Sequence, residues 1–328
     1  MSEKLLKIKN LHTYFYTEEG VVPAVDGLDL EIEKGEALAI VGESGCGKSV
    51  TSLSVLRLIT DPPGKIIEGE IIYRGENLLK KTEKEMREIR GNEMSMIFQE
   101  PMTSLNPVFT VGRQIMESFI YHQKMSKKEA RENAIEMIRM VGIPLPEKIM
   151  DDYPHQLSGG MRQRIMIAMA LACKPKILIA DEPTTALDVT IQAQILRLLI
   201  ELKEKTNTAI ILITHDLGIV AQFATNVIVM YAGEVVENAD VRSIFRKPLH
   251  PYTEGLLKSI PKISEDQEIL YNIKGALPSP RDYPKGCRFA PRCEKKTGVC
   301  LDSKPDLISL HGGRKVRCHT FEEVTAYE

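Results

Sequence analysis

The chain has 328 residues, of which 43 are lysine or arginine and 45 are aspartate or glutamate, so its formal net charge is -2. Its composition, 43% hydrophobic and 27% charged, excludes a disordered chain, and the near-zero net charge argues against a polyanion-binding protein. The length predicts two domains, or one large domain with an appendage. The N-terminus lacks the apolar region of a signal peptide, and the longest apolar stretch, residues 165–173, is too short to span a bilayer.

Three short apolar runs predict buried strands. Residues 37–41 are followed at once by a glycine-rich loop at 42–49 and by a segment, 50–59, whose apolar spacing predicts a helix. Residues 176–180 and 209–213 have the continuous apolar character of strands that are covered on both faces in a parallel sheet. Ligands of open α/β sheets bind at the carboxyl ends of the strands, so the polar residues that follow these runs are candidate site residues.

The segment between these strands has a helical pattern. Ser126 and Glu129 form a predicted capping box, and the apolar spacing that follows ends at Gly142. Residues 101–157 therefore resemble a helical insertion in an α/β core. After residue 245 frequent prolines replace sustained periodicity, which predicts a domain boundary there.

The glycine-rich loop has the pattern Gly-x-x-x-x-Gly-Lys-Ser, which is a P-loop. Its backbone N–H groups and the following helix N-terminus bind phosphate, Lys48 reaches the β- and γ-phosphates, and the Ser49 hydroxyl ligates Mg²⁺. The pattern arises by chance in glycine-rich turns, but the flanking strand and helix favour the functional interpretation. The predicted nucleotide-binding residues here are Gly42, Glu43, Ser44, Gly45, Cys46, Gly47, Lys48, Ser49 and Val50.

Two further motifs complete a nucleotide site. Asp181 and Glu182 follow the strand at 176–180, where one carboxylate can hold Mg²⁺ and the next can polarise the attacking water. Taken alone, two acidic residues at a strand end indicate a solvent-exposed turn. The P-loop earlier in the chain makes a role in the nucleotide site the better interpretation. Ser158, Gly159 and Gly160 open an apolar helix, and their N–H groups and hydroxyl offer a second phosphate-binding surface.

These motifs, in this order, resemble the nucleotide-binding domain of ABC transporters, over residues 5 to 245. The family's signature is Leu-Ser-Gly-Gly-Gln, and Met161 stands here in the place of the glutamine. The resemblance implies that Gln99 is the Q-loop residue, that residues 186–188 form the D-loop and that His215 is the switch histidine. It also implies an aromatic residue near the N-terminus that stacks on adenine. Phe15 fits this position best, and Tyr14 and Tyr16 are alternatives. An aromatic residue with only a structural role in an edge strand would give the same pattern.

The family's mechanism assigns a role to each motif. ATP is bound between the P-loop of one subunit and Ser158, Gly159 and Gly160 of another, so two ATPase subunits are required. Glu182 acts as general base, His215 holds the γ-phosphate, and Mg²⁺ is held through Ser49, Gln99 and Asp181. ATP closes the dimer, and hydrolysis reopens it. Lys48, Glu182 and His215 are the predicted catalytic residues.

The tail narrows the resemblance to the ATPase subunits of peptide and nickel importers, the oligopeptide and dipeptide permease group. The strings that carry it are Pro101 to Pro107, His250-Pro251-Tyr252-Thr253 and the segment from Gly286 to Cys293. Four of the six cysteines lie in this tail at a spacing of Cys-x5-Cys-x6-Cys-x17-Cys, and in a reducing setting metal ligation is a better hypothesis than disulfides. In the family this pattern is associated with a 4Fe-4S cluster, which implies the ligands Cys287, Cys293, Cys300 and Cys318; zinc is the alternative.

The predicted fold is therefore α/β: a P-loop NTPase of the ABC type, with a RecA-like core and a helical subdomain at about 101–157, in residues 1–245. A small proline-rich cysteine-containing domain follows at 246–328. The resemblance implies an ATPase that powers peptide import from the cytoplasmic face of the membrane. Its partners would be a second, paralogous ATPase subunit, two transmembrane permease subunits and, indirectly, an extracytoplasmic peptide-binding protein, with no nucleic acid. Nickel import and a soluble ABC ATPase acting on ribosomes or nucleic acid are the alternatives.

Overall fold

The computed structural model describes residues 4–100, 104–184, 188–260 and 271–321. The chain divides into two compact units. The first contains Glu33–Glu36 and Lys80–Ile213, and the second contains Lys4–Ile32, Ala37–Leu79 and Thr214–Glu328. Each unit is described by itself below. Among the described residues, none of the helices combines the length and the apolar content that crossing a membrane requires.

Parallel strands form the centre of the first unit. Strands β6 (Met94–Ile97), β7 (Ile177–Asp181) and β8 (Ala209–Thr214) lie in the order β8-β7-β6, and both pairings are parallel. Every residue of the three strands is buried. The strands predicted at 176–180 and 209–213 are confirmed, whereas the four-residue strand β6 was too short to be recognised in the sequence.

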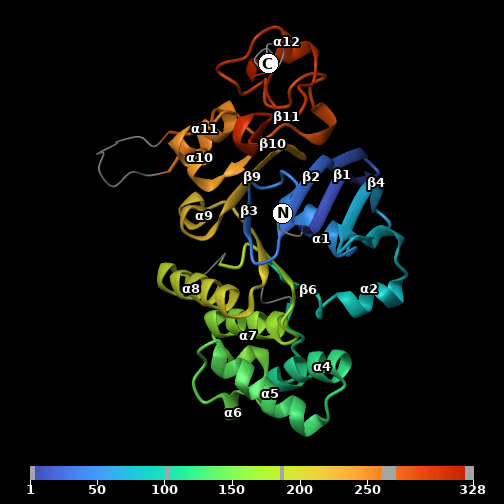
Figure 1. Cartoon of the computed structure of the whole chain (residues 1–328), viewed down its shortest axis with the longest axis vertical. Helices are drawn as coiled ribbons and strands as arrows, with labels where there is room; N and C mark the ends of the chain where they lie inside the picture. Colours follow the sequence, from blue (N-terminus) through green and yellow to red (C-terminus); the bar gives the residue numbers. More distant parts are fainter. Residues whose placement is uncertain (1–3, 101–103, 185–187, 261–270, 322–328) are drawn as a thin grey trace. The chain divides into compact units, whose positions relative to one another are not determined.

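Helices make up the rest of this unit. Helices α4 (Val111–Gln123), α5 (Lys127–Met140) and α7 (Gly159–Leu171) pack on one another, as the green to yellow-green coils of Figure 1 show. The predicted capping box is present, because Ser126 accepts the Glu129 N–H and Glu129 accepts the Ser126 N–H. The remaining elements are α2 (Glu83–Ile89), α6 (Pro146–Ile149), the 3₁₀ turn η2 (Pro154–Gln156) and α8 (Val189–Thr206).

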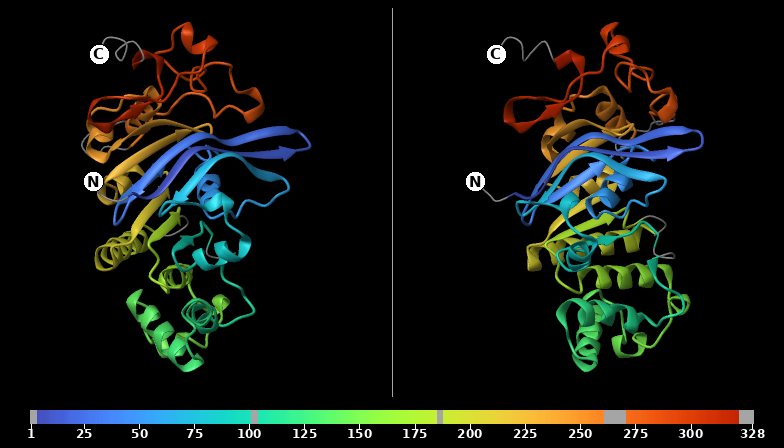
Figure 2. Two further views of the ribbon diagram at one scale, coloured as in Figure 1. Left: turned by 45° about the vertical axis from the view of Figure 1, so that its right-hand side comes forward. Right: turned by 90° about the vertical axis from the view of Figure 1, so that its right-hand side faces the viewer.

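An antiparallel sheet that the sequence did not predict lies in the second unit. Its strands are β1 (Lys4–Thr17), β2 (Gly20–Glu33), β4 (Gly64–Tyr73) and β5 (Glu76–Asn77), in the order β2-β1-β4-β5. Figure 2 shows these blue to cyan strands as a twisted ribbon. The β1–β4 register shifts between Lys9 and Thr13, and the irregular burial that results hides the period-two pattern of a strand. A 3₁₀ turn, η1 (Leu78–Lys80), follows β5.

Another set of paired strands in this unit carries the P-loop. Strand β3 (Ala37–Val41) pairs in parallel with β9 (Asn226–Tyr231), and β10 (Glu234–Asp240), β12 (Lys315–Val316) and β11 (Ile308–Ser309) continue from β9 in antiparallel order. Strand β3 confirms the prediction for 37–41. The helix predicted at 50–59 is α1 (Lys48–Val55), which begins two residues earlier than predicted. It also ends earlier, because Arg57 takes a left-handed conformation with φ 52°.

The tail of the chain contains short elements between its prolines. After α9 (Leu217–Phe223) come α10 (Val241–Arg246), α11 (Pro251–Lys258), η3 (Pro280–Asp282), α12 (Val299–Asp302) and η4 (His311–Gly313). Three aromatic rings, those of Tyr231, Tyr252 and Phe289, pack edge to face or at a tilt with centroids 4.7 to 5.4 Å apart. Tyr231 lies at the end of β9, so this aromatic cluster anchors the tail to the sheet that carries the P-loop.

Candidate functional site

The P-loop connects β3 to α1 and needs its glycines for space as well as conformation. Gly47 has a φ of 105°, and a Cβ there would lie 2.2 Å from the Ala24 carbonyl oxygen. A Cβ on Gly42 would lie 2.3 Å from the carbonyl oxygen of Met230, on the neighbouring strand β9. The loop therefore passes too close to the surrounding backbone for any larger residue at these positions.

Lys48 is the first residue of α1 and is 95% buried. Its ammonium group donates to the carbonyl oxygens of Gly42, at 2.8 Å, and Glu43, at 3.0 Å, so it spans the loop. Gly47 precedes the helix and provides no side-chain cap, whereas Ser44 and Gly45 are exposed. A positive charge beside uncapped backbone N–H groups is the arrangement that binds phosphate.

The aromatic residues near the end of β1 have different environments. Phe15 is partly buried, and its ring lies against Gly64, its partner on β4. The Tyr14 hydroxyl donates to Asp26 at 2.7 Å, whereas Tyr16 is 51% exposed. The hydrogen bond to Asp26 fixes the Tyr14 ring, so Phe15 and Tyr16 remain the candidates for stacking on adenine.

In the first unit, two strand ends bring Gln99 and Glu182 together. Strands β6 and β7 are parallel neighbours, and Gln99 and Glu182 follow their carboxyl ends. The Gln99 side chain donates from Nε2 to Glu182 Oε2 at 3.1 Å. Asp181, the last residue of β7, is 3% exposed. The candidate general base and two candidate Mg²⁺ ligands thus lie at one edge of the sheet.

The backbone of Glu182 has a conformation that non-glycine residues rarely adopt. Its φ is 44°, and its N–H donates to the carbonyl oxygen of Ile213 on β8 at 2.9 Å. A left-handed glutamate costs free energy and persists where the surrounding structure requires it. A backbone hydrogen bond to β8 and a side-chain hydrogen bond from Gln99 therefore fix the position of this glutamate.

The signature segment forms the N-terminus of α7. Ser158 is the N-cap residue, and its hydroxyl accepts the Met161 N–H at 3.3 Å. Ser158 and Gly159 are exposed, and Gly160 lies against Ile191 of α8. The N-terminus of a 13-residue helix favours an anion, so the exposed Ser158 and Gly159 stay the predicted second phosphate-binding surface.

His215, in the second unit, directly follows β8 and is exposed. Asp216, the next residue, caps α9 by accepting the N–H groups of Gly218 and Ile219. Of the predicted D-loop, Asp188 caps α8 through the Ile191 N–H, while residues 186 and 187 lie outside the described residues. Residues 101–103, in the loop after Gln99, also lie outside them.

Comparisons with known proteins decide the family. The chain is 58% identical over 319 residues to the "Oligopeptide transport ATP-binding protein AppD" of Bacillus subtilis, covering 97% of each protein. The chain belongs to the ABC transporter family. The family model described as "ABC transporter" matches residues 25–185, and the one described as "Oligopeptide/dipeptide transporter, C-terminal region" matches residues 236–300.

Other relatives of this ABC ATPase agree. It is 51% identical to the "Dipeptide transport ATP-binding protein DppD" of Escherichia coli, with 96% of each protein covered. Among solved structures, it is similar to the ATP-binding cassette MJ0796 in a dimeric post-hydrolysis state bound to ADP and Pi, with a TM-score of 0.65 and 31% identity. That similarity covers 99% of MJ0796 and 72% of this chain, which confirms the P-loop NTPase fold.

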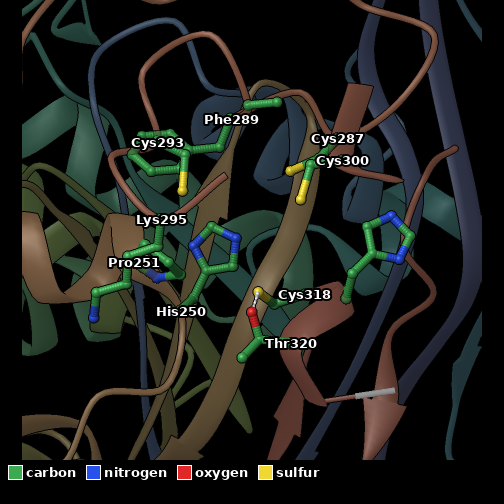
Figure 3. Close-up of a pocket in the computed structure, with 11 residues that line it drawn as sticks. His250, Pro251, Cys287, Phe289, Cys293, Lys295, Cys300, Cys318 and Thr320 are labelled. Atoms are coloured by element: carbon green, nitrogen blue, oxygen red, sulfur yellow. Dashed lines mark hydrogen bonds between the residues drawn. The ribbon is translucent and has the colours of Figure 1, made fainter. Parts of the chain in front are cut away.

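The tail of this ABC ATPase gathers its four cysteines around one pocket. Cys287, Cys293, Cys300 and Cys318 all line it (Figure 3). The Cys287 N–H donates to the Cys300 carbonyl oxygen at 2.9 Å, so the two backbone segments that carry these cysteines are hydrogen-bonded to each other. Burial raises the pKa of the Cys287 thiol to about 11. Within the described ranges, no group of three or more His, Cys, Asp or Glu side chains converges closely enough to hold a single metal ion.

Two histidines of the pocket were not predicted. His250 is 1% exposed, and burial lowers its pKa to about 3. Its Nδ1 accepts the Tyr252 N–H at 3.1 Å, which fixes the neutral tautomer. His319 also lines the pocket and lies next to Cys318 in the sequence. Its position next to Cys318 could have marked His319 as a pocket residue from the sequence. No such mark exists for His250, which lies far from the cysteines along the chain.

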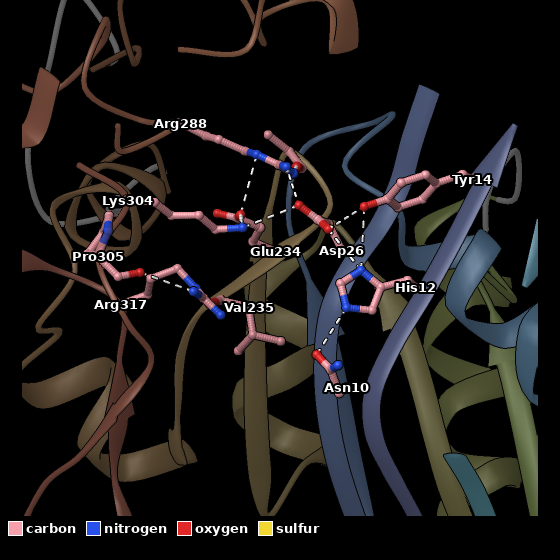
Figure 4. Close-up of polar contacts among 11 residues, drawn as sticks. Asn10, His12, Tyr14, Asp26, Glu234, Val235, Arg288, Lys304, Pro305 and Arg317 are labelled. Atoms are coloured by element: carbon pink, nitrogen blue, oxygen red, sulfur yellow. Dashed lines mark hydrogen bonds and ion pairs between the residues drawn. The ribbon is translucent and has the colours of Figure 1, made fainter. Parts of the chain in front are cut away.

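A charged network connects the tail to β2 and β10 (Figure 4). Arg288 pairs with Asp26 of β2 and, at 3.4 Å, with Glu234 of β10, and Lys304 reaches both carboxylates. Burial opposes ionisation of Asp26, but the Tyr14 hydrogen bond and the charges of Arg288 and Lys304 outweigh it and lower its pKa to about 2. The nucleotide-binding part and the tail therefore share buried ion pairs.

Proposed function

We propose that this chain is the ATP-hydrolysing subunit that powers import of di- or oligopeptides through an ABC transporter. The main support is that the similarity extends over nearly the whole chain. Relatives named for oligopeptide and dipeptide transport match 96–97% of it, including its tail. The cassette MJ0796, by contrast, covers 72% of it. The tail is therefore the part that supports peptide transport over ATP-driven transport in general.

In this proposal the nucleotide-binding domain spans residues 1–245, with a helical subdomain at about 101–157, and the tail domain spans 246–328. Residues 42–50 bind the phosphates of ATP, and Phe15 stacks on adenine. Ser49, Gln99 and Asp181 hold Mg²⁺. These assignments are supported by the close fit of the P-loop against the surrounding backbone and by the position of Gln99 at the strand edge where Asp181 and Glu182 lie.

The Gln99 side chain can serve two groups at once. Its amide nitrogen donates to Glu182, which leaves its carbonyl oxygen for Mg²⁺. Glu182 polarises the attacking water, and His215 orients the γ-phosphate. A bound Mg²⁺ would offset the charge of the phosphates, and Ser49, Gln99 and Asp181 would hold it in place. Gln99 therefore connects Mg²⁺ occupancy to the orientation of the catalytic carboxylate.

The proposed assembly follows from the exposed signature segment. Ser158, Gly159 and Gly160 bind the ATP held by the P-loop of a second, paralogous ATPase subunit, so each subunit completes its partner's site. The pair docks on two transmembrane permease subunits at the cytoplasmic face of the membrane, and an extracytoplasmic peptide-binding protein delivers the substrate. The dimeric state of MJ0796 supports this arrangement.

We also propose that the four tail cysteines hold a 4Fe-4S cluster. Their number and thiol chemistry fit it, and they share one pocket. In a zinc site all four sulfurs contact one ion at about 2.3 Å, whereas each thiolate of a cubane binds a different iron. Zinc is the alternative, because four thiolates suit either group. The cluster would act as a covalent connection between segments of a tail with little regular structure.

Isolation of the chain with its natural partners tests the transport function. We expect permease subunits to co-purify and ATP hydrolysis by the complex to rise when peptide-loaded binding protein is added. Co-purification with ribosomes, or stimulation by nickel and not by peptide, would overturn the proposal.

The catalytic role of Glu182 is tested in the same complex. Glu182→Gln keeps a hydrogen-bonding side chain but removes the base, so kcat should fall by about 10²–10⁴-fold while ATP binding and the closed dimer persist. Hydrolysis close to the wild-type rate would refute the assignment.

The cluster is tested by preparing the protein without oxygen. We expect a brown protein with four irons per chain, whose colour is lost in Cys293→Ser and kept in Cys173→Ser. Colourless protein with one zinc per chain would contradict the proposal.

A further inference from the structure

The second residue of the P-loop, Glu43, is held by the tail. Arg292 donates from one terminal nitrogen to Glu43 Oε2 at 2.7 Å and from the other to Oε1 at 3.0 Å. This is a two-pronged arginine–carboxylate contact, which fixes direction as well as distance. The Arg292 side chain is 6% exposed, so solvent screens the pair weakly.

A second tail residue contacts the same position. The Glu43 N–H donates to the Tyr252 hydroxyl at 2.9 Å. Tyr252 is fully buried in the aromatic cluster, and burial raises its pKa, so the hydroxyl stays protonated. Arg292 thus fixes the side chain of Glu43 and Tyr252 fixes its backbone, although these two tail residues lie 40 positions apart.

Arg292 is itself rigidly held. Its Nε donates to the Lys274 carbonyl oxygen at 3.1 Å, and a terminal nitrogen donates to the Ile273 carbonyl oxygen at 3.3 Å. The guanidinium plane is therefore oriented before any nucleotide binds. A lysine could keep the charge but could not make this planar set of contacts.

The P-loop benefits from such external support because glycines make it flexible. Gly42, Gly45 and Gly47 lie in a loop that must be ordered before consecutive N–H groups can bind phosphate, and ordering flexible backbone costs free energy. Glu43 lies between the first two of these glycines. Contacts that fix Glu43 in advance remove part of that cost from nucleotide binding.

We propose that Arg292 and Tyr252 are positioning residues for the P-loop, which they hold through Glu43 in the conformation that binds nucleotide phosphates. They contact no phosphate themselves and act on affinity, not on the hydrolysis step. The proposal rests on the ATPase assignment and is independent of the transported substrate and of what the four cysteines hold.

Binding of Mg-ADP to the full-length chain, measured by isothermal titration calorimetry, tests this without hydrolysis or dimer closure. Arg292→Gln should raise the Kd about tenfold, and Arg292→Lys should give an intermediate value. Glu43→Gln should match Arg292→Gln, and the double variant should lose no more than either single variant, because both remove one contact. In the complex, Arg292→Gln should raise KM for ATP and leave kcat unchanged.

Arg281→Gln is the matched control. Arg281 also belongs to the tail and also pairs with a glutamate, Glu19, but this pair is exposed and lies outside the P-loop. Its ADP Kd should equal that of the wild type. An unchanged Kd in folded Arg292→Gln, or losses that add fully in the double variant, would overturn the proposal. If Arg292→Gln does not fold, Tyr252→Phe removes one hydroxyl only; we expect a two- to threefold rise in Kd, and an unchanged Kd would overturn the proposal equally.

Discussion

The P-loop and the tail lie in the same compact unit but are stabilised by different interactions. Strand β3 is completely buried and pairs through its main chain, and the P-loop depends on glycines that fit against backbone. The tail has short elements, and buried arginines connect it to acidic residues of the preceding chain. Substitutions in the P-loop should therefore remove function while the fold survives, whereas loss of a buried charge in the tail should reduce stability.

The buried ion pairs explain why the tail is sensitive. Arg288 and Asp26 are each about 10% exposed, and Glu237, which pairs with Arg314, is fully buried. A buried pair adds little over apolar packing, but removing one partner leaves an uncompensated charge. The tail is consequently more dependent on individual charges than the sheet it packs on.

The largest expected effect is on turnover. Lys48→Ala removes an ammonium group that contacts two loop carbonyl oxygens. We expect kcat to fall by at least about 10²–10³-fold, because a charge that stabilises the developing phosphate charge is lost. The melting temperature, measured by circular dichroism, should change little. A large loss of stability would contradict the contrast between the two regions.

The next effect is on stability. Arg288→Met leaves Asp26 and Glu234 buried with Lys304 as their remaining cation, which should reduce the free energy of unfolding by about 3–5 kcal/mol. Urea denaturation measures this directly. Adding Asp26→Asn should recover part of the loss, and a double variant that is less stable still would show that the charges do not act as a pair.

Acid should act on the tail through Asp26. Its pKa is about 2 in the folded protein and about 3.8 in the unfolded chain, so its contribution is fully present above pH 4 and is lost as the pH falls toward 2. The contribution amounts to about 2 kcal/mol. The stability difference between wild type and Asp26→Asn should therefore shrink over this window. A difference that stays constant from pH 5 to pH 2.5 would contradict the assignment.

The smallest effect is expected at the tail's exposed pair. Arg281 and Glu19 have side chains that are 45% and 74% exposed, so Arg281→Gln should change the free energy of unfolding by less than about 1 kcal/mol. The same denaturation assay compares it with Arg288→Met. Equal losses in the two variants would mean that burial does not set the sensitivity of the tail.

The sequence predicted features that are local. The apolar runs of β3, β7 and β8 and the capping box of α5 were recognisable because each depends on neighbouring residues. The sheet of β1, β2 and β4 was not recognisable, because its strands are partly exposed and one carries a register shift. The early end of α1 depends on the left-handed Arg57, which no residue preference marks.

Long-range polar contacts explain the rest of what was missed. Arg292 and Glu43 are 249 positions apart, and Arg288 and Asp26 are 262 apart. Nothing in the pattern around either arginine identifies its partner. The cysteine spacing pointed to a shared site, but His250 joins that pocket through tertiary packing alone.

Uptake of a labelled peptide shows whether ATP hydrolysis by this chain drives transport. The complete transporter, with its binding protein, is reconstituted into vesicles that carry either the wild-type chain or Glu182→Gln, and uptake of a labelled peptide is followed with and without ATP. We predict ATP-dependent accumulation with the wild-type chain and none above background with Glu182→Gln. Equal uptake by the two chains, or uptake that does not require ATP, would contradict the account.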